Sequence, residues 1–377
     1  MSDEVDGRAR IRELAVLFGT LGIIGFGGPA AHVALIRREV VERRAWLSDA
    51  EMLDIVGVTS LIPGPNSTEL AMLVGLRRAG RAGLLVAGIS FILPAATIVL
   101  ALAWAYVAYG TTPIGAAILY GIAPVIVAIV VAAVIAFART ALRSPLTIAL
   151  AGTVALLWLV GVNEIGLLAA GAALIAISRL GARSPVGAII LPLTAGGAAG
   201  VDLVTLGGVF LKAGALLFGS GYVLVAFLRG DLVERLGWLT DAQLIDAVAV
   251  GQVTPGPLFT TATFIGYVVA GIPGAIVATV AIFLPAFVIV AIVGPWVDRI
   301  RDRPVTSALL DGVNAAAIGL MAAVSLQLGA AAIVDPLTAG VGLLAGVLVI
   351  AGKVPSVVLV LAGGVVGVLA RAAGIGL

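Results

Sequence analysis

The sequence predicts an all-α polytopic membrane protein made of two inverted-topology repeats, with re-entrant or broken helices at its Gly/Pro motifs. Three observations lead to this prediction: an apolar composition, an internal repeat, and an exchange of basic loops between the two halves. Apolar residues make up 61% of the 377 residues and charged residues 11%, whereas soluble domains carry roughly 25% charged residues. With a mean hydropathy of +1.21, the chain has more apolar surface than one soluble core can bury, so lipid must solvate much of it.

The composition also excludes several kinds of site. The chain has no cysteine and a single histidine, His32, which excludes disulfides, thiolate metal sites and a polyhistidine metal site within one chain. We therefore expect neither a metal nor another cofactor. Residues 1–12 are of mixed charge and run directly into an apolar segment, so no cleavable signal peptide is expected.

An internal repeat relates the two halves of the chain. Residues 46–54 match residues 238–246 at an offset of 192, with Trp, Leu, Asp and Ala identical in register. The same offset pairs Pro63-Gly64-Pro65 with Pro255-Gly256-Pro257 and, after a one-residue gap, an offset of 191 pairs Pro94 with Pro285. Because Trp, Pro and Asp carry the register, a chance alignment of two apolar, glycine-rich stretches is a poor explanation.

The basic loops indicate that the two repeats are inverted. The loop at 77–81 contains Arg77, Arg78 and Arg81, and its counterpart at 268–273 has no charge. In the next loop pair the charge lies in the second repeat: residues 106–113 are uncharged, and their counterpart is rich in arginine. In two further loop pairs the basic residues are likewise confined to one repeat, first to the first repeat and then to the second. Since short basic loops stay in the cytoplasm, we predict a first repeat over 1–184 with a cytoplasmic N-terminus, a linker transmembrane helix over 185–204, and a second, inverted repeat over 205–377.

The predicted spans follow in order along the chain. Starting from a cytoplasmic N-terminus, they leave the multi-arginine loops inside and the C-terminus outside. The apolar stretches that predict them are 83–104, 114–138, 146–160 and 165–178, then 185–201 in the linker, and 274–296, 305–330, 336–351 and 354–370.

Two apolar segments before the first set of spans are interrupted near their centres. Residues 13–36 contain Gly25-Phe-Gly-Gly-Pro29 and residues 50–76 contain Pro63-Gly64-Pro65. Proline ends helices, and the basic stretches at both ends of each segment place those ends on the same side of the membrane. Each segment is therefore predicted to be a re-entrant hairpin. Two ordinary kinked spans are the alternative. In both cases the break lies at membrane depth, where exposed backbone is tolerated only around a cavity or within protein.

Residues 36–46 and 229–238 lie between the hairpins and are predicted to form amphipathic interfacial helices, with a Trp at the level of the lipid headgroups. Ser48 with Glu51, and Thr240 with Gln243, have the spacing of capping boxes that start the next helix. We expect these four polar residues to be structural.

The four Gly/Pro breaks, two in each repeat, are expected to converge near the bilayer midplane. Broken helices at matching positions of inverted halves are typical of a transport site, and a half-helix that begins after a break presents free N–H groups and a positive dipole end to an anion. The expected ligand is therefore a small oxyanion, although helix capping is the alternative for any one Ser, Thr or Asn. The candidate substrate-binding residues are Gly27, Gly28, Pro63, Gly64, Pro65, Asn66, Ser67, Thr68, Lys212, Gly219, Ser220, Gly221, Pro255, Gly256, Pro257, Thr260 and Thr261.

Ionisable residues at membrane depth are functional candidates. Glu69 stands where the second repeat has Thr261; burial and a nearby anion favour its protonated form, which suits proton coupling, and the alternative is an ion pair with Lys212 or an arginine. His32 titrates near neutral pH and is a second proton-coupling candidate, although a lone histidine near a helix end is often structural. For Lys212 two roles are open: attraction of an anion, or extension of its ammonium group to the membrane–water interface. Asp54 and Asp246 are equivalent and are expected to serve shared architecture.

Several motifs resemble the chromate ion transporter family over nearly the whole chain. Those that resemble its first and second domains lie at 26–29, 46–47, 62–69, 75–83 and 91–94, and at 218–222, 251–257 and 282–285. This resemblance implies secondary active efflux of chromate, with sulfate as a structural analogue, driven by the proton-motive force. It further implies a multi-pass protein of the inner (cytoplasmic) membrane that confers chromate resistance, whose partners are chromate or a similar oxyanion, protons and the lipid bilayer. No nucleic-acid partner is expected, and a homodimer is left open.

Other function classes remain open beside this one. A passive oxyanion channel would have the same architecture but would not accumulate substrate against its gradient. An enzyme is not expected, because the sequence has no Ser/His/Asp set, metal cluster or nucleotide-binding loop. A proton-coupled cation transporter is disfavoured because Glu69 is the single carboxylate beside a break.

Overall fold

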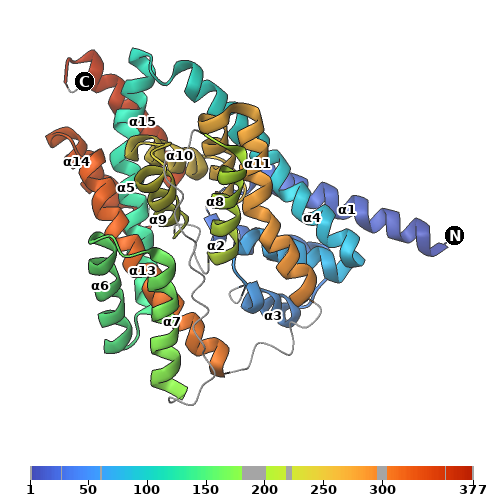
Figure 1. The fold of residues 1–377 in the computed structure, drawn as a ribbon. Coiled ribbons are helices and arrows are strands. Elements are labelled where there is room, and N and C mark those ends of the chain that lie inside the picture. The colour runs from blue at the N-terminus through green and yellow to red at the C-terminus, as the bar shows by residue number, and fades with distance from the viewer. Residues whose placement is uncertain are drawn as a thin grey trace. The chain divides into compact units, whose positions relative to one another are not determined.

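The structure, a computed structural model, describes residues 2–26, 28–59, 62–180, 201–217, 223–294, 304–352 and 354–375. Within these residues every regular element is a helix (Figure 1), which confirms the all-α class. Helices long and apolar enough to cross a membrane cover Asn66–Tyr109, Pro113–Ala141, Leu258–Val293 and Ser307–Ala332, and shorter apolar helices accompany them. The predicted polytopic membrane protein is therefore confirmed, while the inversion of its repeats stays a prediction.

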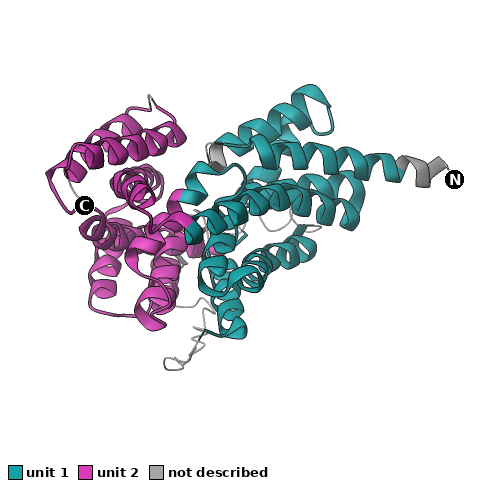
Figure 2. Cartoon of the chain, turned by 90° about the horizontal axis from the view of Figure 1, so that it is seen from above, with its two compact units in different colours: residues 1–108, 201–221, 250–301 teal, residues 109–200, 222–249, 302–377 magenta. Residues whose placement is uncertain are grey.

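The chain divides into two compact units, each of which takes segments from both predicted repeats (Figure 2). Unit 1 contains residues 1–108, 201–221 and 250–301, and unit 2 contains residues 109–200, 222–249 and 302–377. The units group segments by contact, whereas the repeat boundaries at 184 and 205 describe duplication along the chain. Those boundaries stay a prediction.

Unit 1 holds the Gly/Pro breaks. Its core is built from large buried side chains such as Phe18, Ile55, Met72 and Phe91. Its elements are α1 (Ser2–Ile24), α2 (Gly28–Arg37), the π-helix η1 (Arg38–Arg43), α3 (Asp49–Thr59), α4 (Asn66–Tyr109), α8 (Leu203–Leu216), the short 3₁₀ helix η3 (Leu258–Thr260) and α11 (Thr261–Val293).

Helices α4 and α11 each reverse direction at a glycine. Gly80 has φ 60° and ψ −150°, and Gly271 has φ 61° and ψ −152°. In α4, a methyl group at Gly75 would overlap the carbonyl group of Gly83, although eight residues of continuous helix span about 12 Å. The two arms of α4 therefore fold against each other as a hairpin, and the same contact joins Gly266 and Gly274 in α11.

Unit 2 is a bundle in which α13 packs against α5, α6 and α7, and α5 packs against α14 and α15. Glycines allow the closest approach, because a methyl group at Gly121 would lie 2.6 Å from the backbone nitrogen of Gly367. Its elements are α5 (Pro113–Ala141), α6 (Pro145–Leu159), α7 (Glu164–Leu180), α9 (Val223–Leu228), the π-helix η2 (Arg229–Arg235), α10 (Asp241–Val253, whose last turn belongs to unit 1), α13 (Pro304–Ala332), α14 (Pro336–Ile350) and α15 (Ser356–Ala372).

The predicted element boundaries agree with the observed ones to within a few residues. Helices α5, α6 and α14 each begin with proline behind a capping side chain, from Thr112, Ser144 and Asp335 respectively. The predicted linker helix at 185–204 lies largely outside the described residues. Of it, the structure describes residues 201–204, where α8 begins at Leu203 behind the capping side chain of Asp202.

The predicted interfacial helices are continuations rather than separate helices. Helix α2 runs directly into η1, and α9 runs directly into η2. Both predicted capping boxes are present: the backbone N–H of Glu51 donates to Ser48 Oγ over 3.2 Å, and that of Gln243 donates to Thr240 Oγ1 over 3.1 Å.

Candidate functional site at the helix breaks

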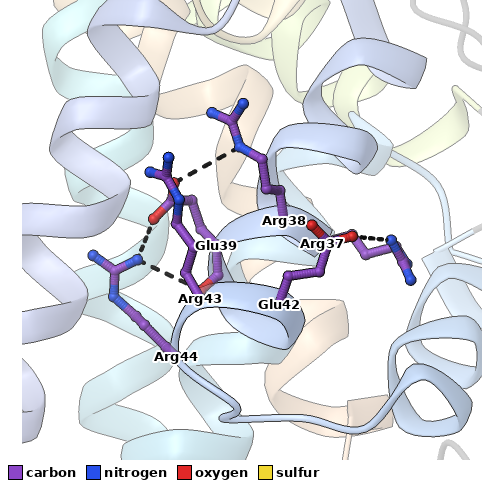
Figure 3. Close-up of polar contacts among 6 residues, drawn as sticks. All are labelled: Arg37, Arg38, Glu39, Glu42, Arg43 and Arg44. Carbon is purple, nitrogen blue, oxygen red and sulfur yellow. Dashed lines mark hydrogen bonds and ion pairs between the residues drawn. The ribbon is translucent and has the colours of Figure 1, made fainter.

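An ion-pair cluster follows the first break on the η1 helix (Figure 3). Glu39 accepts hydrogen bonds from Arg43, over 2.6 Å, and from Arg44, and Arg37 pairs with Glu42 and Asp49, each over 2.5 Å. Although partial burial opposes its charged form, the pKa of Glu39 is held below its ordinary value by Arg44 and Arg43. These arginines are therefore neutralised locally and fix the shape of η1.

The same cluster occurs on η2, at positions 192 residues further along. Arg229, the counterpart of Arg37, bonds to Glu234 and, over 2.7 Å, to Asp241, and Arg235 donates to Asp231 over 2.9 Å. Three ion pairs, those of Arg37 with Glu42 and Asp49 and that of Arg43 with Glu39, thus have equivalents in the second repeat, whereas Arg44 is replaced there by Leu236. The repeated pairs belong to the shared architecture of the repeats.

Two buried Pro-Gly-Pro turns begin the candidate site. Gly64 has φ 138° and Gly256 has φ 89°, values that glycine adopts without strain. Pro65 is followed at once by α4 and Pro257 by η3 and α11. The sequence prediction that each motif interrupts the helical path is therefore confirmed by the backbone.

Each Pro-Gly-Pro turn binds the first break of the other repeat. The Gly64 N–H donates to the Leu217 carbonyl over 2.7 Å, and the Gly256 N–H donates to the Gly25 carbonyl over 2.8 Å. At the offset of 192, Gly256 is the counterpart of Gly64 and Leu217 is the counterpart of Gly25. Such an exchange, in which i contacts j′ and j contacts i′, is what a two-fold relation between two copies produces. The breaks thus meet in two pairs within unit 1.

The side-chain packing around the turns follows the same exchange. A methyl group at Gly64 would lie 3.2 Å from Ala286 Cβ, and one at Gly256 would lie 2.5 Å from Ala95 Cβ, where Ala95 and Ala286 are themselves counterparts. Both turns therefore press their backbone against the proline-containing stretch of the other repeat's hairpin helix. A methyl group at Gly256 would overlap Ala95, and one at Gly64 would have to displace the Glu69 carboxyl group.

Glu69 distinguishes the first repeat at this position. Its side chain is completely buried, and neither carboxyl oxygen has a hydrogen-bond partner among the described residues. Oε1 lies directly above Gly64, where it would block a methyl group. The Oγ1 of Thr68 and the Oδ1 of Asn66 are also buried without a partner there. Buried polar atoms are normally paired, so this turn of α4 has unused capacity for a proton or a ligand.

The second repeat uses its equivalent side chains locally. Thr261, the counterpart of Glu69, donates its hydroxyl to the Leu258 carbonyl, and Thr260 donates to the Pro257 carbonyl, each over 2.8 Å. Both hydroxyls therefore donate to carbonyls of their own turn, neither η3 nor α11 has a side-chain cap at its start, and the hydroxyl oxygens stay available as acceptors. The two turns consequently differ in charge and in unpaired polar atoms, although their backbones correspond.

His32 connects the α2 helix to the first break. Its Nε2 lies 2.8 Å from the Gly25 carbonyl, and its ring meets the edge of Phe91 with centroids 5.5 Å apart. A carbonyl only accepts, so Nε2 carries the proton. The other ring nitrogen, Nδ1, is buried without a partner among the described residues.

The remaining predicted residues are placed as follows. Lys212 is half-buried on α8, Asp54 is half-buried on α3, and Asp246 is buried on α10. Gly28 begins α2, and Ser67 is buried in the first turn of α4. Gly27, Gly219, Ser220 and Gly221 lie outside the described residues.

Sequence reasoning missed the groups that receive the bonds between repeats. Gly25 and Leu217 contribute backbone carbonyls, which carry no side-chain signal, and Ala95 and Ala286 contribute only small size. The one available signal was their register, because each pair sits at the repeat offset and close to a Gly/Pro motif.

Comparison with known proteins adds a family and several relatives. The family described as Chromate transporter matches residues 12–177 and again residues 204–368. The chain is 35% identical to the chromate transport protein of Cupriavidus metallidurans, over 94% of this chain and 91% of that protein. It is 32% identical to the chromate transport protein of Pseudomonas aeruginosa over the same shares, and 33% identical to the probable chromate transport protein of Synechococcus elongatus over 89% of this chain and 88% of that one. No solved structure matches.

Proposed function

Because the chain belongs to the chromate transporter family, we propose that it transports chromate across the cytoplasmic membrane, outward and coupled to protons. The relatives are named as chromate transport proteins, and the described helices include several that are long and apolar enough to span a bilayer. The observation that carries the proposal within this chain is the buried turn at Pro63-Gly64-Pro65 and the start of α4, where the Thr68 hydroxyl is a potential donor without a partner and the Glu69 carboxyl is an unpaired titratable group among the described residues.

The backbone of this turn supports an oxyanion ligand. The amides of Thr68 and Glu69 already donate to the Pro65 carbonyl, so the amides of Asn66 and Ser67 are the ones at the open end of α4. An open helix end presents its first N–H groups and the positive end of its dipole, which favours a tetrahedral dianion. The amide of Asn66 and the hydroxyls of Ser67 and Thr68 would add donors from side chains.

Glu69 is the proposed proton-coupling group. A buried carboxyl beside an anion cannot remain ionised without strong repulsion, so the proton content of Glu69 and the occupancy of the anion site depend on each other. Its counterpart, Thr261, cannot titrate. The link between protonation and anion binding is therefore confined to the Pro63-Gly64-Pro65 turn. Lys212 is the proposed source of long-range attraction for the anion from α8.

Flux measurement in proteoliposomes tests the proposal. Chromate movement is followed in vesicles with imposed pH gradients of both signs, and sulfate is offered as a competitor. We expect chromate to move against the direction of proton movement and to accumulate above its equilibrium level. Chromate and protons moving together would overturn proton-driven efflux, and the absence of chromate flux would overturn the substrate. Failure of sulfate to compete would overturn sulfate as a second substrate.

The same vesicle assay distinguishes a coupled transporter from a passive channel of the same architecture. A channel lets chromate equilibrate with the membrane potential but never accumulate beyond it, whatever the pH gradient. Measurement at zero membrane potential, set with a potassium ionophore, therefore decides between the two functions.

A further inference from the structure

His32 donates a hydrogen bond to a backbone carbonyl that also joins the two repeats. The Gly25 carbonyl receives two donors, the His32 Nε2–H over 2.8 Å and the Gly256 N–H over 2.8 Å. A carbonyl oxygen has two lone pairs, so these two bonds use its full accepting capacity. One imidazole therefore holds the same atom to which the Pro-Gly-Pro turn of the other repeat is attached.

The second repeat lacks this arrangement. The equivalent carbonyl, that of Leu217, receives the Gly64 N–H over 2.7 Å, but the counterpart of His32 is Leu224, whose side chain has no donor. The pair of breaks that includes Gly256 is thus held by a side chain as well as by backbone, and the pair that includes Gly64 is held by backbone. Glu69 lies at the second of these pairs, directly against Gly64.

The surroundings of His32 favour a fixed ring. The side chain is 2% exposed, its ring packs edge-on against Phe91, and its Cδ2 lies 3.1 Å from where a methyl group at Gly25 would stand. Nδ1 has no hydrogen-bond partner among the described residues, so a second proton on the ring would be a buried, unpaired donor. The ring is therefore suited to donate permanently from Nε2 and poorly suited to carry a proton in each transport cycle.

We infer that His32 is a positioning residue: its Nε2–H fixes the Gly25 carbonyl, and through it the Gly256 turn, as the rigid half of the site. The Gly64 turn, against which Glu69 packs, has no such side-chain bond in the equivalent position, because Leu224 replaces His32. This inference rests on the proposed function for its transport readout, but its structural readout is independent of any substrate.

Two variants separate a donor from a proton carrier. His32→Gln keeps an N–H donor at a similar reach from the backbone but cannot titrate, and His32→Leu installs the residue of the second repeat and removes the donor. Thr20→Val is the matched control on α1, since the Thr20 hydroxyl bonds only to the Val16 carbonyl of its own helix among the described contacts. All three are purified and compared for monodispersity before use.

Hydrogen–deuterium exchange of the purified protein gives the structural readout. We expect His32→Leu to raise the exchange rate of peptides that contain Gly256 by about tenfold, the effect of losing one buried hydrogen bond. Peptides that contain Gly64 should be unchanged, and His32→Gln and Thr20→Val should resemble the unsubstituted protein. Equal acceleration at both glycines, or none at Gly256, would overturn the positioning role.

The transport readout uses the chromate vesicles. We expect His32→Gln to keep both the rate and the pH profile, and His32→Leu to lower the maximal rate while its remaining flux keeps the pH profile. A flattened pH profile in both variants would instead make His32 a proton carrier. If no protein transports chromate but Gly256 alone exchanges faster in His32→Leu, the proposed substrate fails and the positioning role stands.

Discussion

At the scale of single residues, Glu69 is a buried position where a titratable side chain in one repeat faces a neutral one in the other. The sequence comparison with Thr261 predicted a buried carboxyl beside a break, and the structure places it there, fully buried against Gly64. What could not be predicted is that both carboxyl oxygens lack partners among the described residues, because pairing depends on side chains brought in from distant segments.

Replacing Glu69 with glutamine should remove the pH dependence of transport while keeping the site intact. The amide has the shape of the protonated carboxyl but cannot release a proton, so chromate should still bind while flux no longer responds to a pH gradient. Glu51→Gln is the control, since Glu51 is an exposed carboxylate that bonds to Ser48 in a capping box. Unaltered pH dependence in Glu69→Gln would remove Glu69 from the coupling mechanism.

Ala45 and Gly237 offer a reciprocal test of backbone strain. They are counterparts at the end of the π-helices, both exposed, with φ 49° and φ 64°. Alanine in the left-handed region costs about 1 kcal/mol or slightly more, so Ala45→Gly should raise the thermal unfolding temperature in detergent and Gly237→Ala should lower it. Gly208→Ala on α8, where a methyl group meets open space, is the control. Shifts of the same sign for both changes would contradict the prediction.

At the scale of elements, helix periodicity and turn residues predicted most boundaries. Prolines at the first position and capping side chains explain why α5, α6 and α14 begin where expected. The sequence could not distinguish an interfacial helix from a continuation of α2, because the π-helix η1 has no separate start signal. The basic loop at 77–81 was predicted to separate two apolar segments, but the backbone contact of Gly75 with Gly83 within α4 was not predicted.

The hairpin turns of α4 and α11 should both require glycine, and to the same extent. Gly80 and Gly271 share a conformation close to a region that only glycine populates, although a methyl group at either would meet open space. Gly80→Ala and Gly271→Ala should therefore each cost about 1–3 kcal/mol of unfolding free energy from backbone strain alone. Chemical unfolding in mixed micelles measures the cost, and Gly340→Ala in α14 is the control. A neutral result at one of the two would contradict the equivalence of the turns.

At the scale of the whole molecule, the duplication was visible in the sequence, while the grouping into two compact units was not. Each unit draws segments from both halves, an outcome decided by contacts far apart along the chain. The family model matches each half of the chain once, over residues 12–177 and 204–368, which agrees with the duplication. The orientation of each half in the membrane is open to direct measurement.

The absence of cysteine from the chain makes that measurement direct. Ala82 and Pro273 are counterparts, both exposed beside the hairpin turns. In Ala82→Cys and Pro273→Cys, labelled with a membrane-impermeant maleimide, we expect reaction from the cytoplasmic face for the first and from the opposite face for the second. Reaction from one face in both would show parallel repeats. The unsubstituted protein is the control for labelling background.

The exchanged bonds of Gly64 and Gly256 also bear on how such a chain could have arisen. A polypeptide carrying a single repeat would have a turn amide and a break carbonyl, but each would be satisfied only by a second copy of itself. Association of two separate copies would meet the same need. Covalent linkage lets the two copies carry different residues at matching positions, as Glu69 and Thr261 or His32 and Leu224 do here, whereas two identical chains must carry the same residue at both.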